Sequence, residues 1–323
     1  MRDELERLSA RLPLPPGWSA PELYADAIAV GGRTVRRVGV LSRGPDGREA
    51  TGSAAQLEGS PLPRAWYELL ERASILDGEG PRPVRDARGA PLGEVARGSA
   101  DPGIDPRRRR SRSNGVALHT DWAAACERAR LELLERDRVL ASWLGEGEPT
   151  PTEAPAWLGE VGAHEWRAVR LDAPGDGDAV AAVVGFPVRS EVPLARGFAA
   201  RAASEDAVEA AAAEAVQSLA FLWDEPVPTE PPPSAPTPLF HLDYYLCPET
   251  HGALRRWLDG GLARGASDPV ARRPSELRFV DLTPAWLERP AVRVARAIDP
   301  AARELFFGEL PGVEAERRVH PIP

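Results

Sequence analysis

The clearest hydrophobic periodicity in the chain lies between Asp121 and about Leu144. Apolar residues recur there at spacings of three, four and seven, at Trp122, Cys126, Ala129, Leu133, Leu140 and Leu144. This spacing places them on one face and predicts a long amphipathic helix. A second helix is predicted from about Pro63 to Leu76, with Pro63 just inside its start, and a third is predicted to follow Ser204 as its cap.

Short apolar segments bounded by turn residues predict several strands around these helices. Gly31-Gly32 is the turn signal between the first two of them, and residues 113–115 form a turn into the third. The expected strands are Asp26–Val30, Thr34–Leu41, Val116–Leu118, Trp166–Leu171, Ala179–Val188, Gly197–Ala200, Leu277–Leu282 and Ala291–Ala295.

The helix after Ser204 is almost wholly apolar from Ala210 to Trp223, and Glu214 and Gln217 interrupt the apolar run three residues apart. A helix this apolar is expected to be buried, and a buried carboxylate needs a partner to offset its desolvation. Glu214 is therefore a candidate site residue. The alternative is a position at the rim of a partly exposed helix.

The remaining segments are less periodic. Residues 1–12 predict a short charged helix that ends at a cluster of prolines. Residues Glu225 to Pro238 are so rich in proline that an extended loop is expected, and Glu249 to Leu262 predicts a further short helix.

The pentapeptide Glu-Leu-Leu-Glu-Arg occurs twice, at Glu68–Arg72 and at Glu132–Arg136, inside the first two of the predicted long helices. Residues three apart share a helix face, so each copy presents two carboxylates side by side. Crowded carboxylates repel one another unless a cation neutralises them, and oxygen ligands suit Mg²⁺. The alternative is a pair of ordinary amphipathic helices whose charged faces are solvated.

The amino-acid composition excludes several classes of ligand and catalytic mechanism. The formal charge of −9 over 323 residues argues against general affinity for nucleic acid. The chain contains no lysine, so all 40 of its Lys and Arg residues are arginine. A Walker-type phosphate loop and Schiff-base catalysis both need lysine and are excluded.

No apolar stretch resembles a signal peptide or a membrane span, so a soluble, cytoplasmic protein is expected. The two cysteines, Cys126 and Cys247, lie far apart, and the five histidines are scattered singly. Neither a disulfide framework nor a zinc site has a sequence signature.

Taken in order, several of these pieces resemble the YcaO family. They are Glu68/Glu71/Arg72, Ser113-Asn114-Gly115, Glu132/Glu135/Arg136-Asp137, Gly197-Phe198-Ala199-Ala200 with Glu214/Gln217, Asp281-Leu282-Thr283, and His320-Pro321-Ile322-Pro323. The resemblance covers residues 50 to 323 and implies a division into an N-terminal helix with strands, 1–49, and a YcaO-like domain, 50–323. It implies an α/β fold with glutamate-bearing helices packed on mixed β-sheets around a central nucleotide cleft.

The resemblance also implies ATP and Mg²⁺ as cofactors. Metal ligands would be Glu68, Glu71, Glu132 and Glu135, and nucleotide-binding residues would be Arg72, Ser113, Asn114, Arg136, Glu214 and Gln217. Pro321 and Pro323 would line the reacting centre. The expected activity is phosphorylation of a peptide backbone amide oxygen, followed by attack of a substrate Cys, Ser or Thr to close an azoline, or formation of a thioamide or amidine.

The implied substrate is a ribosomally made precursor peptide. A separate leader-binding or E1-like protein could deliver it, and a homodimer is compatible with the family. The other interpretation is a degenerate YcaO-like protein that binds a peptide or a partner enzyme without turning over ATP.

Departures from the family pattern motivate that alternative. Thr120 and Ala124 stand where an amide and a carboxylate are expected, Arg64 where serine is common, and Arg128 where Gln or His is common. Residues Ala50–Ala54 stand in for a Gly-Lys-Gly-type turn. The arginine run Arg107–Arg112 could attract phosphates or an acidic leader peptide, or it could be a solvated loop.

Overall fold

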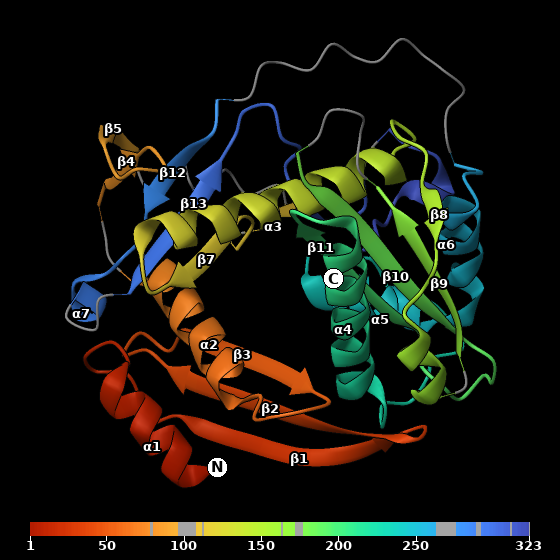
Figure 1. Cartoon of the computed structure of the whole chain (residues 1–323), viewed down its shortest axis with the longest axis horizontal. Coiled ribbons are helices and arrows are strands. Elements are labelled where there is room, and N and C mark those ends of the chain that lie inside the picture. Colours follow the sequence, from red (N-terminus) through yellow and green to blue (C-terminus); the bar gives the residue numbers. More distant parts are fainter. Residues whose placement is uncertain are drawn as a thin grey trace.

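Each of the three predicted long helices packs on its own antiparallel sheet in the computed structural model of the chain (Figure 1). The structure describes residues 1–77, 80–95, 108–111, 113–162, 164–171, 177–262, 276–288, 292–310 and 312–322. Within these ranges every strand pairing is antiparallel. The expected combination of helices and sheets is confirmed, but the described sheets are antiparallel where mixed sheets were predicted.

The first sheet is a meander of β1 (Glu22–Val30), β2 (Arg33–Arg43) and β3 (Glu49–Gln56). Val30 pairs with Arg33 across the predicted Gly31-Gly32 turn, where Gly31 has a φ of 60°. β3 includes the segment predicted to be a turn, because residues 49–56 pair with β2 along their whole length. This pairing crosses the boundary placed at residue 49, and the division into 1–49 and 50–323 stays a prediction.

Helix α2 (Leu62–Leu76) covers this sheet, and α1 (Arg2–Arg11) packs beside α2. Trp66 on α2 is fully buried and its indole N–H donates to the Leu12 carbonyl at 3.1 Å. Pro63 lies in the first helical turn, as predicted.

The second sheet has the order β5-β4-β12-β13-β7 and is covered by α3 (Trp122–Trp143). Asp121 caps this helix, since its carboxylate accepts from the Ala124 N–H at 2.8 Å. The strands are β4 (Arg82–Arg85), β5 (Pro91–Val95), β7 (Val116–His119), β12 (Arg278–Asp281) and β13 (Arg293–Ile298). The strand expected at Ala291–Ala295 therefore begins two residues later, and Ala291 lies outside the described residues.

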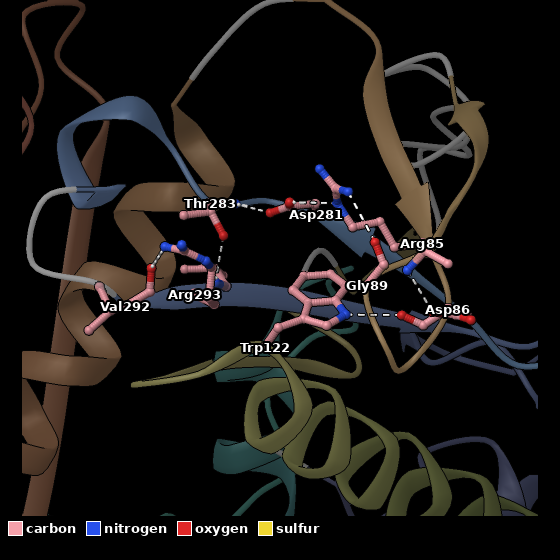
Figure 2. Close-up of polar contacts among 10 residues, drawn as sticks. Arg85, Asp86, Gly89, Trp122, Asp281, Thr283, Val292 and Arg293 are labelled. Atoms are coloured by element: carbon pink, nitrogen blue, oxygen red, sulfur yellow. Dashed lines mark hydrogen bonds and ion pairs between the residues drawn. The ribbon is translucent and has the colours of Figure 1, made fainter.

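The Asp281-Leu282-Thr283 segment joins strands of this sheet (Figure 2). The Asp281 carboxylate accepts from Arg85 Nε and from the Thr283 N–H, both at 3.0 Å. Thr283 Oγ1 accepts from the Val294 N–H at 3.0 Å. These bonds hold the end of β12 against β4 and β13, which is a structural role.

The third sheet has the order β11-β10-β9-β8, and α4 (Ser204–Leu222) covers it. Its strands are β8 (Thr150–Thr152), β9 (His164–Arg170), β10 (Ala179–Pro187) and β11 (Ala195–Arg201). Ala203 occupies the N-cap position of α4 and Ser204 is its first helical residue, so the predicted serine cap is wrong.

The other face of this sheet packs against α5 (Pro238–Leu246) and α6 (His251–Leu258) in one apolar cluster. α5 was not predicted; it begins where the proline-rich segment ends, with Pro238 at its first position and Thr237 accepting from the Phe240 N–H. The predicted helix at 249–262 is shortened to α6, preceded by the 3₁₀ turn Pro248–Thr250.

Short elements complete the described fold. β6 (Arg108–Arg110), from the arginine run, pairs with β14 (Phe306–Gly308), and Arg107 and Arg112 lie outside the described residues. The remaining elements are η2 (Ala156–Glu160), α7 (Ala285–Glu288) and η4 (Ala315–Arg317). None of the described helices has the length and apolar character needed to cross a membrane.

Candidate functional site

Glycines bring the glutamate-bearing helices unusually close to their strands. A Cβ at Gly52 on β3 would lie 1.9 Å from the Ala65 carbonyl oxygen of α2. A Cβ at Gly197 on β11 would lie 2.2 Å from the Ala211 carbonyl oxygen of α4. Real Cβ atoms do not approach backbone this closely, so only glycine allows these helices to sit where they do.

The residue after each glycine holds a glutamate of the facing helix. Ser53 donates its backbone N–H to Glu68 at 2.7 Å, and Val116, after Gly115, donates to Glu132 at 3.0 Å. The Phe198 N–H, after Gly197, makes the equivalent bond to Glu214. The three helices thus present their carboxylates in the same way, each fixed by a strand N–H.

Further contacts tie the first two helices together. Glu71 of α2 accepts from the Leu118 N–H of β7 at 3.2 Å, which links α2 to the sheet under α3. Arg72 pairs with Glu68 at 2.6 Å and donates to Thr51 Oγ1 at 2.7 Å. Arg72 therefore fixes the position of Glu68 relative to β3.

Arg136 plays the same part on α3. It pairs with Glu132 at 2.5 Å and donates to the Ser113 carbonyl oxygen at 3.2 Å and to Asn114 Oδ1 at 3.4 Å. Ser113 and Asn114 thus contact the site through Arg136.

α2, α3 and α4 surround a cavity of about 870 Å³, called here the central cavity. Five of the predicted site residues line it: Glu68, Glu71, Glu132, Glu214 and Gln217. Five others do not line it and lie on the same helices or the adjoining turn: Arg72, Ser113, Asn114, Glu135 and Arg136. Carboxylates separated by up to 146 positions in the sequence thus meet at one site, between Glu68 and Glu214.

The predicted reacting centre at the C-terminus is not part of the central cavity. Pro321 is buried and is not among the lining residues, and Pro323 lies outside the described residues. The adjoining His320 ring donates to the Phe306 carbonyl oxygen at 2.7 Å, and its own carbonyl oxygen accepts from His241 Nδ1 at 3.0 Å. The role of both prolines stays a prediction.

Desolvation by the surrounding protein raises the pKa of Glu71 well above its ordinary range, and the nearby carboxylates of Glu132 and Glu68 add to the rise. The pKa of Glu135 is raised well above its ordinary range by desolvation and by Glu214. The ionised form of these carboxyls is therefore disfavoured, and a bound cation would favour it.

Of the two positions considered for Glu214, a buried carboxylate or the rim of a partly exposed helix, the structure shows an exposed residue in the wall of the central cavity. Its pKa is nevertheless raised to about 7, first by desolvation from the dense protein around it and also by Glu132. Arg136, Phe198 N–H and Arg64 act in the opposite direction. Glu214 is therefore placed to gain or lose a proton near neutral pH.

Several other residues with polar side chains line the cavity and were not predicted as site residues from the sequence: Ser53, Arg64, Tyr67, His119, Thr120, Arg128 and Arg201. Four of them are positions at which the chain departs from the family pattern: Arg64, Thr120, Arg128, and Ser53 of the Ala50–Ala54 segment. Arg201 ends β11, directly after the Gly197–Ala200 segment. Its place beside that motif could have identified it as a site residue from the sequence. The departures are therefore concentrated at the cavity itself.

The residues present fit a nucleotide with Mg²⁺. The cavity offers several carboxylates for a hard cation and three arginines for phosphates. No group of three or more His, Cys, Asp or Glu side chains within the described ranges is arranged to hold a metal ion by itself. This is compatible with Mg²⁺, which proteins usually bind through one or two carboxylates together with phosphate and water oxygens.

Comparison with known sequences gives one family. The family model described as YcaO cyclodehydratase, ATP- and Mg²⁺-binding, matches residues 96–296. No curated protein matches the chain.

Solved structures share the fold at low sequence identity. A YcaO protein from Methanopyrus kandleri bound with AMPPCP and Mg²⁺ has a TM-score of 0.63 and 20% identity, over 100% of this chain and 94% of that one. A heterocyclase in complex with substrate and cofactor gives 0.62 and 15%, over 93% of this chain and 52% of the heterocyclase. The Escherichia coli microcin synthetase McbBCD complex gives 0.60 and 12%, over 93% and 96%.

Proposed function

The chain belongs to the YcaO cyclodehydratase family, and on that premise we propose that it uses ATP and Mg²⁺ to activate a backbone amide of a peptide. The observation that supports this most directly is the convergence of Glu71, Glu132 and Glu214 from three helices on one cavity that also holds arginines. Phosphoryl transfer asks a protein mainly for positioning and charge neutralisation, and these groups supply both.

Glu71 and Glu132 would hold Mg²⁺ together with phosphate oxygens, and Gln217 and the cavity arginines would face the nucleotide. When bound, ATP with Mg²⁺ supplies the phosphoryl group that converts an amide oxygen into a leaving group. Glu68 and Glu132 are held by backbone N–H groups and by Arg72 and Arg136, so the site is positioned before a ligand arrives.

The attacking group belongs to the substrate. Both cysteines of the chain are buried, and desolvation raises the pKa of the Cys126 thiol to about 12, which suppresses the reactive thiolate. A Cys, Ser or Thr of the peptide would attack the activated carbon, and the phosphorylated oxygen would leave as phosphate as the azoline ring forms. The peptide thereby loses the elements of one water per ring. The His119 imidazole lies in the cavity wall, with Nδ1 near Thr120 Oγ1, and its Nε2 would take the proton of the attacking group.

The relatives suggest how a substrate could reach the site. The microcin synthetase is a complex of several proteins, and one of its structures holds pro-MccB17. We infer that this chain also acts on a precursor peptide, alone or with a separate leader-binding or E1-like protein.

Calorimetry with ATP and Mg²⁺ tests the nucleotide site. Glu71→Gln and Glu214→Gln should each weaken binding of the Mg²⁺ complex by about tenfold or more, because each removes a carboxylate available to the bound cation. Glu205→Gln, an exposed substitution in the first turn of α4, is the matched control and should bind as the parent does. Absence of nucleotide binding by the parent protein would rule out the proposed function.

Activity is tested with peptides that contain Cys, Ser or Thr, using mass spectrometry to detect loss of one water per ring and a phosphate assay to detect ATP consumption. Water loss that requires ATP identifies a cyclodehydratase. Replacement of the amide oxygen by sulfur or nitrogen, when sulfide or an amine is supplied, identifies thioamide or amidine formation.

The second candidate is a YcaO-like protein that binds a peptide or partner enzyme without ATP turnover. Thr120 in the cavity wall and Ala124 nearby on α3, in place of an amide and a carboxylate, favour it. Peptide binding with no ATP consumption under any of these conditions would select this function over the first.

A further inference from the structure

The repeated pentapeptide is part of a longer repeat that includes a cavity arginine. Residues 64–72 read Arg-Ala-Trp-Tyr-Glu-Leu-Leu-Glu-Arg and residues 128–136 read Arg-Ala-Arg-Leu-Glu-Leu-Leu-Glu-Arg, identical at seven of nine positions. Arg64 and Arg128 thus stand one helical turn before Glu68 and Glu132, on the same face. Both arginines line the central cavity, one from α2 and one from α3.

The two arginines of each repeat differ in their contacts. Arg72 and Arg136, at the end of each copy, are held by ion pairs to Glu68 and Glu132 and by further hydrogen bonds. Arg64 and Arg128 are exposed, and neither has a hydrogen bond or an ion pair to any residue of the described ranges. Their guanidinium groups remain available to a ligand.

The contacts of the two glutamates run to the side away from these arginines. Glu68 and Glu132 each accept from a strand N–H and pair with the arginine at the end of the repeat, Arg72 or Arg136. Arg64 acts on Glu214 across the cavity only at a distance, enough to lower the pKa of that carboxyl. Arg201, at the end of β11, adds a third cavity arginine, which donates to its neighbour's carbonyl oxygen at 2.7 Å.

The chemistry of two free guanidinium groups facing one cavity fits a polyphosphate. A guanidinium is always charged and presents paired N–H donors that match phosphate oxygens. The cavity has room for such a ligand at about 870 Å³. Carboxylates in the same wall lack a self-sufficient metal group within the described ranges, so fixed positive charge is needed from another source.

We propose that Arg64 and Arg128 form a clamp, one from each copy of the repeat, that binds the polyphosphate of the nucleotide and takes over part of the charge neutralisation that Mg²⁺ would otherwise supply. The inference rests on the proposed function, since it assigns residues of the same cavity to the nucleotide. Its consequence is that nucleotide binding depends only weakly on Mg²⁺.

Binding measurements in the presence and absence of Mg²⁺ test the clamp. A non-hydrolysable ATP analogue and inorganic tripolyphosphate are titrated by calorimetry into the full-length protein, once with excess EDTA and once with Mg²⁺. The parent protein should bind both probes in EDTA, with a Kd within about tenfold of its value in Mg²⁺. Arg64→Ser and Arg128→Gln should each weaken binding in EDTA by about tenfold or more, and by less in Mg²⁺.

Arg7→Ser is the matched control, because Arg7 is an exposed arginine of α1 that does not line the cavity. It should leave all four titrations unchanged. Thermal melting of each variant checks that the fold is retained, as expected for exposed side chains.

The outcomes separate this inference from the proposed function. An ATP analogue that binds only with Mg²⁺, and equally well to the Arg64 and Arg128 variants, overturns the clamp and leaves the nucleotide site standing. Tripolyphosphate binding that the variants lose, without any binding of the ATP analogue, supports the clamp and overturns the nucleotide function. Absence of binding by both probes under both conditions overturns both.

Discussion

Single residues at the central cavity show how position decides the chemistry of a carboxylate. Glu68 is paired with an arginine and a backbone N–H, whereas Glu71 lies among other carboxylates and has a strongly raised pKa. Glu214 faces the same cavity from a third helix, and its pKa is raised to about 7. The surroundings of Glu71 and Glu214 therefore favour retention of a proton at higher pH than is usual for glutamate.

The Glu214 carboxyl should make stability fall as the pH rises. Its pKa is about 4.5 unfolded and about 7 folded, so the folded state keeps a proton that the unfolded state has lost, and this advantage disappears between pH 4.5 and 7. The Glu214→Gln variant has no carboxyl at this position, so its stability does not fall with pH for this reason. We expect the variant to gain on the order of 1 kcal/mol relative to the parent between these limits, because cavity water screens the exposed side chain.

Melting temperatures of both proteins across pH 4.5 to 8 measure this difference. Other titrating groups, including the buried histidines, are present in both proteins and largely cancel in the comparison. A difference that is constant over the whole range would show that Glu214 titrates at its ordinary pKa.

At the scale of elements, the site is built by close contact between helix and strand. Gly52, Gly115 and Gly197 each precede a strand residue whose N–H holds a glutamate of the facing helix. The same arrangement therefore occurs three times, on α2, α3 and α4. The missing side chains of these glycines therefore position the helices as much as apolar packing does.

Replacing Gly52 or Gly197 with alanine should separate helix from strand. The new Cβ would meet the Ala65 or Ala211 carbonyl oxygen at 1.9 or 2.2 Å, and backbone cannot yield as a flexible side chain can. We expect each variant to lose about 1–3 kcal/mol or more of unfolding free energy and to weaken nucleotide binding as its glutamate moves.

Gly147→Ala is the matched control for both. Gly147 is exposed, a Cβ added there would meet no atom within 4 Å, and its backbone does not require a positive φ, so alanine should be neutral or slightly stabilising. Denaturant unfolding compares the three variants. Equal stability of all three would mean that the helices can shift without cost.

The sequence predicts some elements much better than others. The long periodicities of α2, α3 and α4 are found close to their expected bounds, because each helix has a continuous apolar face. β3 was missed, since its alanines, glycine and serine have little strand preference of their own, and pairing with β2 determines their conformation. α5 was missed because prolines precede it closely.

At the scale of the whole molecule, convergence of distant segments was the least predictable feature. The order of the motifs indicated which residues belong to a site, but the close approach of α4 to α2 and α3 depends on three separate sheets. At the C-terminus, Pro321 is buried and does not line the central cavity, and the placement of the terminal prolines at the reacting centre stays a prediction. Sequence spacing carries no information on such long-range packing.

The C-terminal segment instead joins distant parts of the described fold. The Trp143 indole of α3 donates to the Arg317 carbonyl oxygen at 3.0 Å, and Tyr245 Oη of α5 donates to the Val319 carbonyl oxygen at 2.6 Å. Val319 and Ile322 belong to the apolar cluster that contains Trp143 and Tyr245. The chain end therefore acts as a connection between α3, α5 and the third sheet.

Tyr245→Phe should weaken this connection. The phenol ring is fully buried, so removing its hydroxyl leaves the Val319 carbonyl oxygen without that donor in a site closed to water. An unsatisfied buried acceptor costs about 1–3 kcal/mol, which corresponds to a fall in Tm of a few degrees for a chain of this size. Tyr244→Phe is the matched control: Tyr244 is its neighbour on α5 and is only partly buried.

Thermal unfolding and hydrogen exchange of both variants distinguish a local from a global role. If the C-terminal segment connects distant elements, Tyr245→Phe should speed exchange in residues 317–322 and in the Trp143 end of α3, while Tyr244→Phe changes neither. Faster exchange confined to α5 would show that the hydrogen bond stabilises its own helix alone, and the C-terminal segment would then be held by its apolar contacts.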